Sequence, residues 1–209
     1  MQFSKDFKAA ISDLPSKEKD KLLLRLLKKD LNLANRLHFE LLDDKTVDDR
    51  RALMADKVKK RVAAICDNYY SPGYLMMDLR YLSGEITEHV NITKDKFGEV
   101  TLTLLMLNEC LPHSMTKVAT APPSKSRKLG VYIIARAFKL LLLIKKMHAD
   151  YQIDFKDDVT QLGEHISESA VLMKTAIYHG LDVNWLLQFH IPEDIEEIHR
   201  DLKKRGYLK

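Results

Sequence analysis

The chain has 209 residues, of which 45% are hydrophobic and 31% charged, with a formal net charge of +4; this composition excludes a wholly disordered chain and fits one folded domain. Seven glycines and six prolines are fewer than a β-sandwich or barrel of this length would need for its turns. We therefore expect a single all-α domain over residues 1–209, built from about 8–10 helices. Either a multi-helix bundle or an array of helical hairpins would satisfy the pattern, the latter HEAT-like by analogy only.

Apolar residues at helical spacing predict six helices before residue 112. The first ends before Pro15, and the others cover residues 16–29, 31–42, 46–69, 72–90 and 100–111. Thr46, with Asp49 three residues later, resembles a capping box at one helix start. Ser71 followed by Pro72 predicts a cap and a first helical turn at another. Pro112 is expected to end the sixth helix.

Residues 112–125 are polar and contain three prolines, so we expect a long polar and basic loop. A long helix follows over residues 126–151; it is apolar over most of its circumference and is therefore predicted to lie at the centre of the fold. Further helices are expected over residues 157–179, from residue 182, and from residue 192 to the end.

The most unusual feature of the chain is a run of forty residues, 110–149, without one carboxylate. Its cations, with one tyrosine available for stacking, form a candidate site for nucleic acid or another polyanion. The candidate residues are Lys117, Lys125, Arg127, Lys128, Tyr132, Arg136, Lys139, Lys145 and Lys146. The alternative is that these side chains extend from a largely buried helix and are neutralised by neighbours such as Asp157 and Asp158.

A second candidate surface would bind a protein partner. Four tyrosines gather around a predicted turn, namely Tyr69, Tyr70, Tyr74 and Tyr81, and tyrosine combines contact area with a polar tip. They could instead cover the end of the core at a helix corner. On the predicted helix over residues 157–179, Val171 and Leu172 point away from the apolar face, so a further helix or another chain should cover them.

The sequence lacks the motifs of several large enzyme classes. It contains no glycine-rich phosphate loop and no nucleophile elbow, and its two cysteines, Cys66 and Cys110, belong to no CxxC pair and are expected to be reduced thiols. Carboxylates and histidines occur together on two helices, at residues 85–89 and 164–168, but without the Glu-x-x-His spacing of a di-iron site. We expect no catalytic motif, no metal and no cofactor.

Three functions remain open. The first is a non-catalytic helical interaction or scaffold module that binds a protein partner or a second copy of itself. The second is binding of nucleic acid or another polyanion through residues 117–146. The third is an enzyme whose site is assembled from distant residues, such as His89 with Glu85 or His148 with Asp150, and it is the least favoured. Without a signal peptide or an apolar run long enough for a membrane span, we expect a cytoplasmic protein with no membrane partner.

Overall fold

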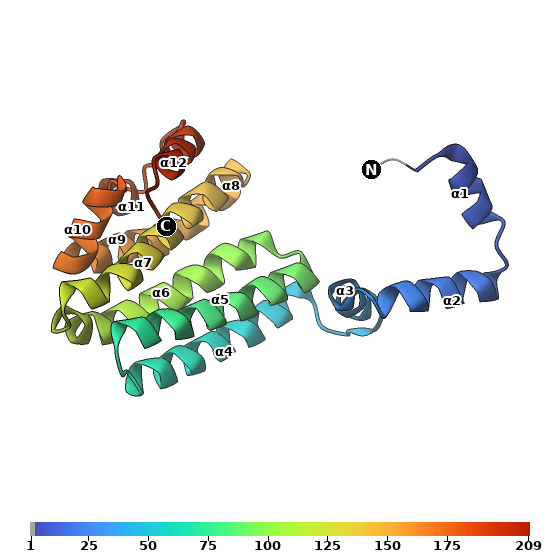
Figure 1. Ribbon diagram of the computed structural model, residues 1–209, viewed down its shortest axis with the longest axis horizontal. Coiled ribbons are helices and arrows are strands. Elements are labelled where there is room, and N and C mark those ends of the chain that lie inside the picture. Colours follow the sequence, from blue (N-terminus) through green and yellow to red (C-terminus); the bar gives the residue numbers. More distant parts are fainter. Residues whose placement is uncertain (1–2) are drawn as a thin grey trace.

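The computed structural model describes residues 3–209, which are 80% helical and contain no strand, so the predicted all-α fold is confirmed. These residues form twelve α-helices and one short 3-10 turn, and ten of the helices are eight residues or longer (Figure 1). The helices are α1 (Lys5–Ser12), α2 (Ser16–Leu27), α3 (Leu31–Leu42), α4 (Val47–Asp67), α5 (Pro72–Thr93), α6 (Lys96–Ala119), α7 (Pro123–Lys145), α8 (Ala149–Gln152), α9 (Lys156–Glu168), α10 (Ala170–His179), α11 (Asn184–Leu187) and α12 (Ile195–Lys204). None of the helices in residues 3–209 is long and apolar enough to cross a membrane.

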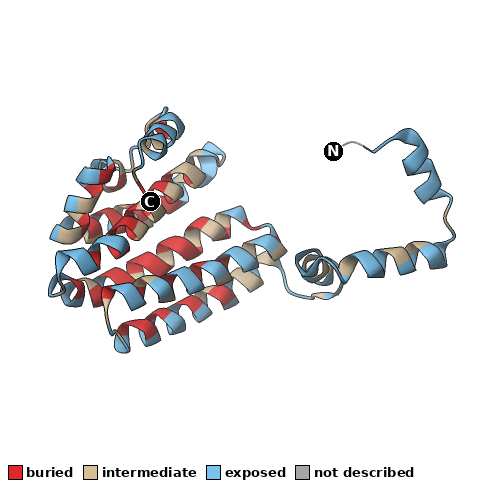
Figure 2. Cartoon of the chain, in the orientation of Figure 1, coloured by how far each residue is buried: buried red, intermediate tan, exposed pale blue. Residues whose placement is uncertain are grey.

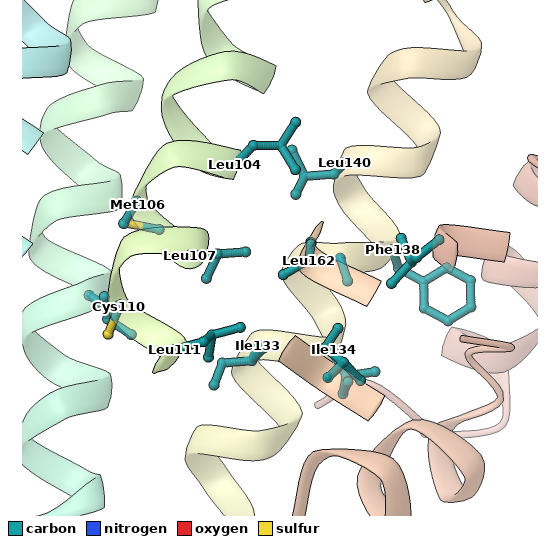
Figure 3. Packing of buried hydrophobic residues seen from close by; sticks show 14 of the residues in the cluster. Leu104, Met106, Leu107, Cys110, Leu111, Ile133, Ile134, Phe138, Leu140 and Leu162 are labelled. Atoms are coloured by element: carbon teal, nitrogen blue, oxygen red, sulfur yellow. The ribbon is translucent and has the colours of Figure 1, made fainter. Parts of the chain in front are cut away.

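The core is built around α6 and α7, which lie side by side (Figure 1). Burial is concentrated on these two helices and on the faces that α4, α5 and α9 turn toward them (Figure 2). Leu104, Leu107 and Leu111 of α6 point toward α7 (Figure 3). Helix α7 also packs against α5, α10 and α12, as expected of a central helix. It is shorter than predicted, because the chain leaves the helix after Lys145 and begins α8 separately.

The predicted loop over residues 112–125 is wrong, because α6 continues through Pro112 to Ala119 and only three residues separate it from α7. Proline costs an internal helix roughly 3 kcal/mol. Ser114 and Val118 are almost fully buried one and two turns beyond Leu111, so the same face of the helix stays in the core. The Ser114 hydroxyl also donates to the Cys110 carbonyl at 2.8 Å. Burial of this face outweighs the loss of one backbone hydrogen bond.

The predicted helix over residues 157–179 is in fact two helices, α9 and α10. The chain is extended at Ser169 (φ −96°, ψ 107°), whose side chain accepts a hydrogen bond from the Leu172 amide at 3.4 Å. The break redirects every residue that follows it. Leu172, predicted to be covered by a further helix or by another chain, is consequently 1% exposed and belongs to the core, where α10 packs against α7.

Two predicted helix starts are confirmed. The Thr46 hydroxyl accepts from the Asp49 amide at 3.1 Å while the Asp49 carboxylate accepts from the Thr46 amide at 3.0 Å, which is a full capping box. The Ser71 side chain accepts from the Tyr74 amide, and Pro72 is the first residue of α5. Both caps satisfy amides that the helix itself leaves without a partner.

Residues 3–46 form what we call the N-terminal arm. Its helices α1, α2 and α3 contain no buried residue, and α1 and α2 project away from the other helices (Figures 1 and 2). The arm joins the remaining helices where α3 packs against α5 and where Arg50 lies over the Phe39 ring and pairs with Asp43. A folded core therefore carries a largely uncovered helical extension.

Candidate functional site

A groove of about 1060 Å³ lies between α5, α7, α12 and the chain after α12. We call it the basic groove, because seven of the side chains lining it are lysine or arginine and none is aspartate or glutamate. The seven are Arg80, Arg127, Lys128, Arg136, Lys139, Lys203 and Lys209. Its apolar lining comes from Met76, Val131, Ala135, Leu142 and Leu208.

Most of these cations have no anionic partner within the described residues. Lys139 pairs with Glu99 of α6 at 2.6 Å, and the other six make no ion pair in residues 3–209. Like charges that converge on a concave surface raise the local potential and attract anions. The groove thus presents a concentrated positive field over an apolar base.

The residues of α7 reach the groove because they recur every three or four positions along the helix. Lys128, Tyr132, Arg136 and Lys139 follow this spacing and share one face. The Tyr132 hydroxyl donates to the Leu79 carbonyl at 3.1 Å, which anchors the ring against α5. The guanidinium of Arg136 lies 5.2 Å from the centre of that ring. This contact holds Arg136 in place at the middle of the groove.

The structure brings together five of the nine residues predicted to bind a polyanion: Arg127, Lys128, Tyr132, Arg136 and Lys139. The other four lie elsewhere. Lys145 pairs with Glu193 at 2.7 Å and Lys146 with Glu196 at 3.3 Å, so acidic side chains partly neutralise them. Lys125 is exposed near the start of α7 but does not line the groove. Lys117 donates to the Cys66 carbonyl at 2.9 Å, away from the groove.

Three groove cations, Arg80, Lys203 and Lys209, were not among the predicted residues. They come from α5 and from the C-terminal end of the chain, so helix packing alone makes them neighbours of α7. The distribution of charge along the sequence did not identify them as binding residues, since acidic residues lie on both sides of Arg80 and precede Lys203.

The residues of the predicted partner surface do not form one exposed patch: some are exposed, and others are half-buried or buried. Tyr70, Tyr74 and Tyr81 are exposed by 79%, 58% and 64%, and Met77 between them is exposed on the same side of α5. Tyr69 is half-buried, with the Lys117 ammonium 5.7 Å from its ring centre. On α10, Val171 is half-buried and borders a pocket, whereas Leu172 is internal, as described above.

The residue pairs considered for catalysis are not desolvated acid–base pairs. His148 Nδ1 and Asp150 Oδ2 are 3.2 Å apart, but both side chains are largely exposed. Glu85 instead pairs with Lys57 at 2.9 Å. His89 is half-buried, and burial lowers its pKa. Within residues 3–209, no three histidine, cysteine, aspartate or glutamate side chains gather as a metal site would require.

No protein-family model matches the chain, and no solved structure matches it.

Proposed function

We propose that the protein binds single-stranded nucleic acid in the basic groove. The observation that carries this proposal is the lining of the groove, seven cations with no aspartate or glutamate among them. Phosphate groups are the anions that such a surface is suited to hold, since each lysine or arginine can neutralise one and release its counterion.

The size of the groove favours a polymer over a small anion. Its volume of about 1060 Å³ lies just above the ~300–1,000 Å³ of small-molecule sites. Between Arg127 and Lys139 the lining extends for about 18 Å along α7, at 1.5 Å per residue. At ~3.4 Å per stacked nucleotide, that length accommodates about five nucleotides.

The shape and lining of the groove favour a single strand. A concave surface can follow a flexible backbone, whereas reading a duplex requires an element that protrudes into one of its grooves. Apolar side chains such as Met76 and Val131 offer surface for the bases, while the cations flank them. Proteins that bind single strands without regard to sequence combine a positively charged groove with aromatic side chains on which bases stack. In this groove Tyr132 supplies an aromatic ring, and aliphatic side chains supply the rest of the apolar surface.

The test is fluorescence anisotropy of a labelled oligothymidylate of about 16 nucleotides, titrated with the full chain at several salt concentrations. With five phosphates neutralised, log K should fall against log salt with a slope of about −3 to −4. The triple variant Arg127→Gln, Lys128→Gln, Arg136→Gln should weaken binding and reduce that slope by about 2.

The matched control removes three cations from α4, which does not line the groove: Lys57→Gln, Lys60→Gln, Arg61→Gln. It lowers the net charge equally and should leave the affinity nearly unchanged. Equal losses in the two triple variants would mean that binding follows net charge, and would refute the groove as the site. Equal or tighter binding of a duplex of the same length would refute the preference for single strands.

A second candidate function is self-association through the N-terminal arm. Ten of the large apolar side chains exposed by 40% or more lie in this arm: Phe3, Phe7, Ile11, Leu23, Leu24, Leu26, Leu31, Leu33, Leu41 and Leu42. Exposed apolar surface of this extent is typical of an interaction site. Residues 3–46 carry ten basic and eight acidic side chains, so two copies of the arm can pair without strong repulsion.

Sedimentation velocity of the full chain tests self-association. We expect a dimer that forms with rising concentration and is lost in the variant Leu24→Lys, Leu41→Lys. The control Ile177→Lys alters a side chain that is 72% exposed on α10, outside the arm, and should leave the dimer intact. A chain that sediments at 24.2 kDa at every concentration would rule out this function of the arm.

A further inference from the structure

Two cysteines that are far apart in the sequence meet in the core. Cys66 lies in the last turn of α4 and Cys110 in the middle of α6, and their sulfur atoms are 3.9 Å apart. Both are free thiols. On α6, Cys110 points away from α7, toward which Leu107 and Leu111 turn (Figure 3). A disulfide needs about 2.05 Å between sulfurs, so closing the pair requires an approach of roughly 2 Å.

The two thiols differ in access to solvent. Cys66 lines a pocket of about 220 Å³ at the surface between α4 and α6, and Cys110 does not line it. Cys110 is 0% exposed and Cys66 4% exposed. Cys66 therefore borders space that a small reagent can enter, and Cys110 does not. The Cys110 sulfur instead contacts the Cys66 sulfur at 3.9 Å and the Ser114 hydroxyl at 3.6 Å.

The surroundings also favour ionisation of Cys66 over Cys110. With both thiols neutral, the Cys66 thiol donates to the Cys110 sulfur and to the Cys110 carbonyl, each at 3.9 Å. When Cys66 ionises, the Cys110 thiol can donate to the thiolate instead; this contact, together with the nearby charge of Lys117, lowers the pKa of Cys66 although burial opposes it. Lys117 is held in place by its 2.9 Å bond to the Cys66 carbonyl. The same thiol–thiol contact, with burial, raises the pKa of Cys110. The access to the pocket and the direction of the pKa shifts therefore both indicate that Cys66 reacts before Cys110.

We propose that Cys66 and Cys110 form a peroxide-reactive pair in which Cys66 is attacked first and Cys110 closes an internal disulfide. The Cys66 thiolate attacks one oxygen of a hydroperoxide, the O–O bond breaks, and the other oxygen leaves as an alkoxide or hydroxide that takes up a proton, giving Cys66 sulfenic acid and an alcohol or water. The Cys110 sulfur then attacks the Cys66 sulfur. The hydroxyl leaves with the Cys110 proton as water, and the two thiols have lost the two electrons that reduced the peroxide.

The experiment treats the full folded chain with hydrogen peroxide, alkylates the remaining thiols and measures the intact mass and the cysteine peptides. We expect both thiols to disappear together, with a mass loss of roughly 2 Da for the two thiol hydrogens that dithiothreitol restores. The cross-linked peptide should contain Cys66 and Cys110. The urea-unfolded chain is the control, since in it Cys66 should lose its advantage over Cys110.

Two variants separate the roles. In Cys110→Ser, Cys66 should accumulate as a sulfenic acid that dimedone traps; in Cys66→Ser, Cys110 should remain unmodified. The wild-type measurement needs neither variant, so the proposal stays testable if a serine variant fails to fold. Persistence of both thiols in the folded chain under peroxide that oxidises the unfolded chain would overturn the proposal. Oxidation of Cys110 in Cys66→Ser as fast as Cys66 in Cys110→Ser would overturn the assigned order.

Discussion

Arg51 of α4 donates two hydrogen bonds to the carboxylate of Asp95, the N-cap residue of α6. Its Nε lies 2.6 Å from Asp95 Oδ2 and its Nη2 lies 2.9 Å from Oδ1. The Asp95 carboxylate also accepts from the Gly98 amide at 2.8 Å, and its side chain is only 4% exposed. One carboxylate therefore fixes both the start of α6 and the position of α4 beside it.

Arg51→Met should destabilise the protein by about 3 kcal/mol, because it leaves the buried Asp95 carboxylate without its counterion. The control is Lys57→Met on the same helix, where the ion pair with Glu85 is more exposed and is expected to contribute less than about 1 kcal/mol. Chemical denaturation monitored by circular dichroism measures both. Similar losses in the two variants would contradict the role of Asp95.

Gly98→Ala should also destabilise, although glycine to alanine within a helix normally stabilises by about 0.5–1 kcal/mol. A Cβ at this position would lie 2.1 Å from Asp95 Oδ2 and 3.0 Å from Arg51 Nε, both of which are held by the ion pair. Gly84→Ala in α5 is the matched substitution, since nothing lies within 4 Å of its Cβ. We expect thermal melts to shift in opposite directions, down for Gly98→Ala and up for Gly84→Ala.

Stability should fall as the pH drops below about 6.5, in part through His179. Burial lowers the pKa of His179, as does the charge of Arg127, and its Nδ1 accepts from the Leu208 amide at 3.0 Å. Below the ordinary histidine value the unfolded chain then binds more protons than the folded one, so the free energy of unfolding decreases with acid. His179→Gln should show a smaller loss of Tm between about pH 7.5 and about pH 5.5. The remaining loss comes from His89 and His199, whose pKa values burial also lowers.

Leu172→Ala should cost about 2–5 kcal/mol, the usual range for removing a buried leucine side chain. Val171→Ala, at the half-buried position next to it, should cost less than about 1 kcal/mol. Urea denaturation of the two variants compares them directly. A larger loss of stability in Val171→Ala than in Leu172→Ala would mean that α10 does not turn Leu172 toward the core, and would contradict the orientation that the break at Ser169 gives to α10.

The fold could be predicted to the extent that local rules decided it. Helical spacing and the caps at Thr46 and Ser71 gave the right elements, because each depends on neighbours within a few residues. Local rules failed at Pro112, where burial of Ser114 and Val118 carries the helix onward. They failed again at Ser169, which caps a new helix in the middle of a continuous apolar pattern; the break changes the direction of every side chain after it.

The residues of the candidate site were likewise predictable only in part from the sequence. The cations of α7 could be identified from the sequence, since they share one helix face and lie in a segment without carboxylates. Arg80 and Lys203 could not, because only packing brings them to α7. The proximity of Cys66 and Cys110 had no sequence signal either: 44 positions separate them, and the register of α4 against α6 alone aligns their sulfurs.

The N-terminal arm implies that backbone amides in this chain exchange with solvent by two routes. No described residue before Met54 is buried, so α1 and α2 can open and close without disturbing the core. Amides of α6 and α7 can exchange with solvent only when the whole core unfolds. Hydrogen exchange should therefore be fast in α1 and α2 and slow beyond Met54, and the arm should gain protection as the protein is concentrated if its exposed leucines meet those of a second copy.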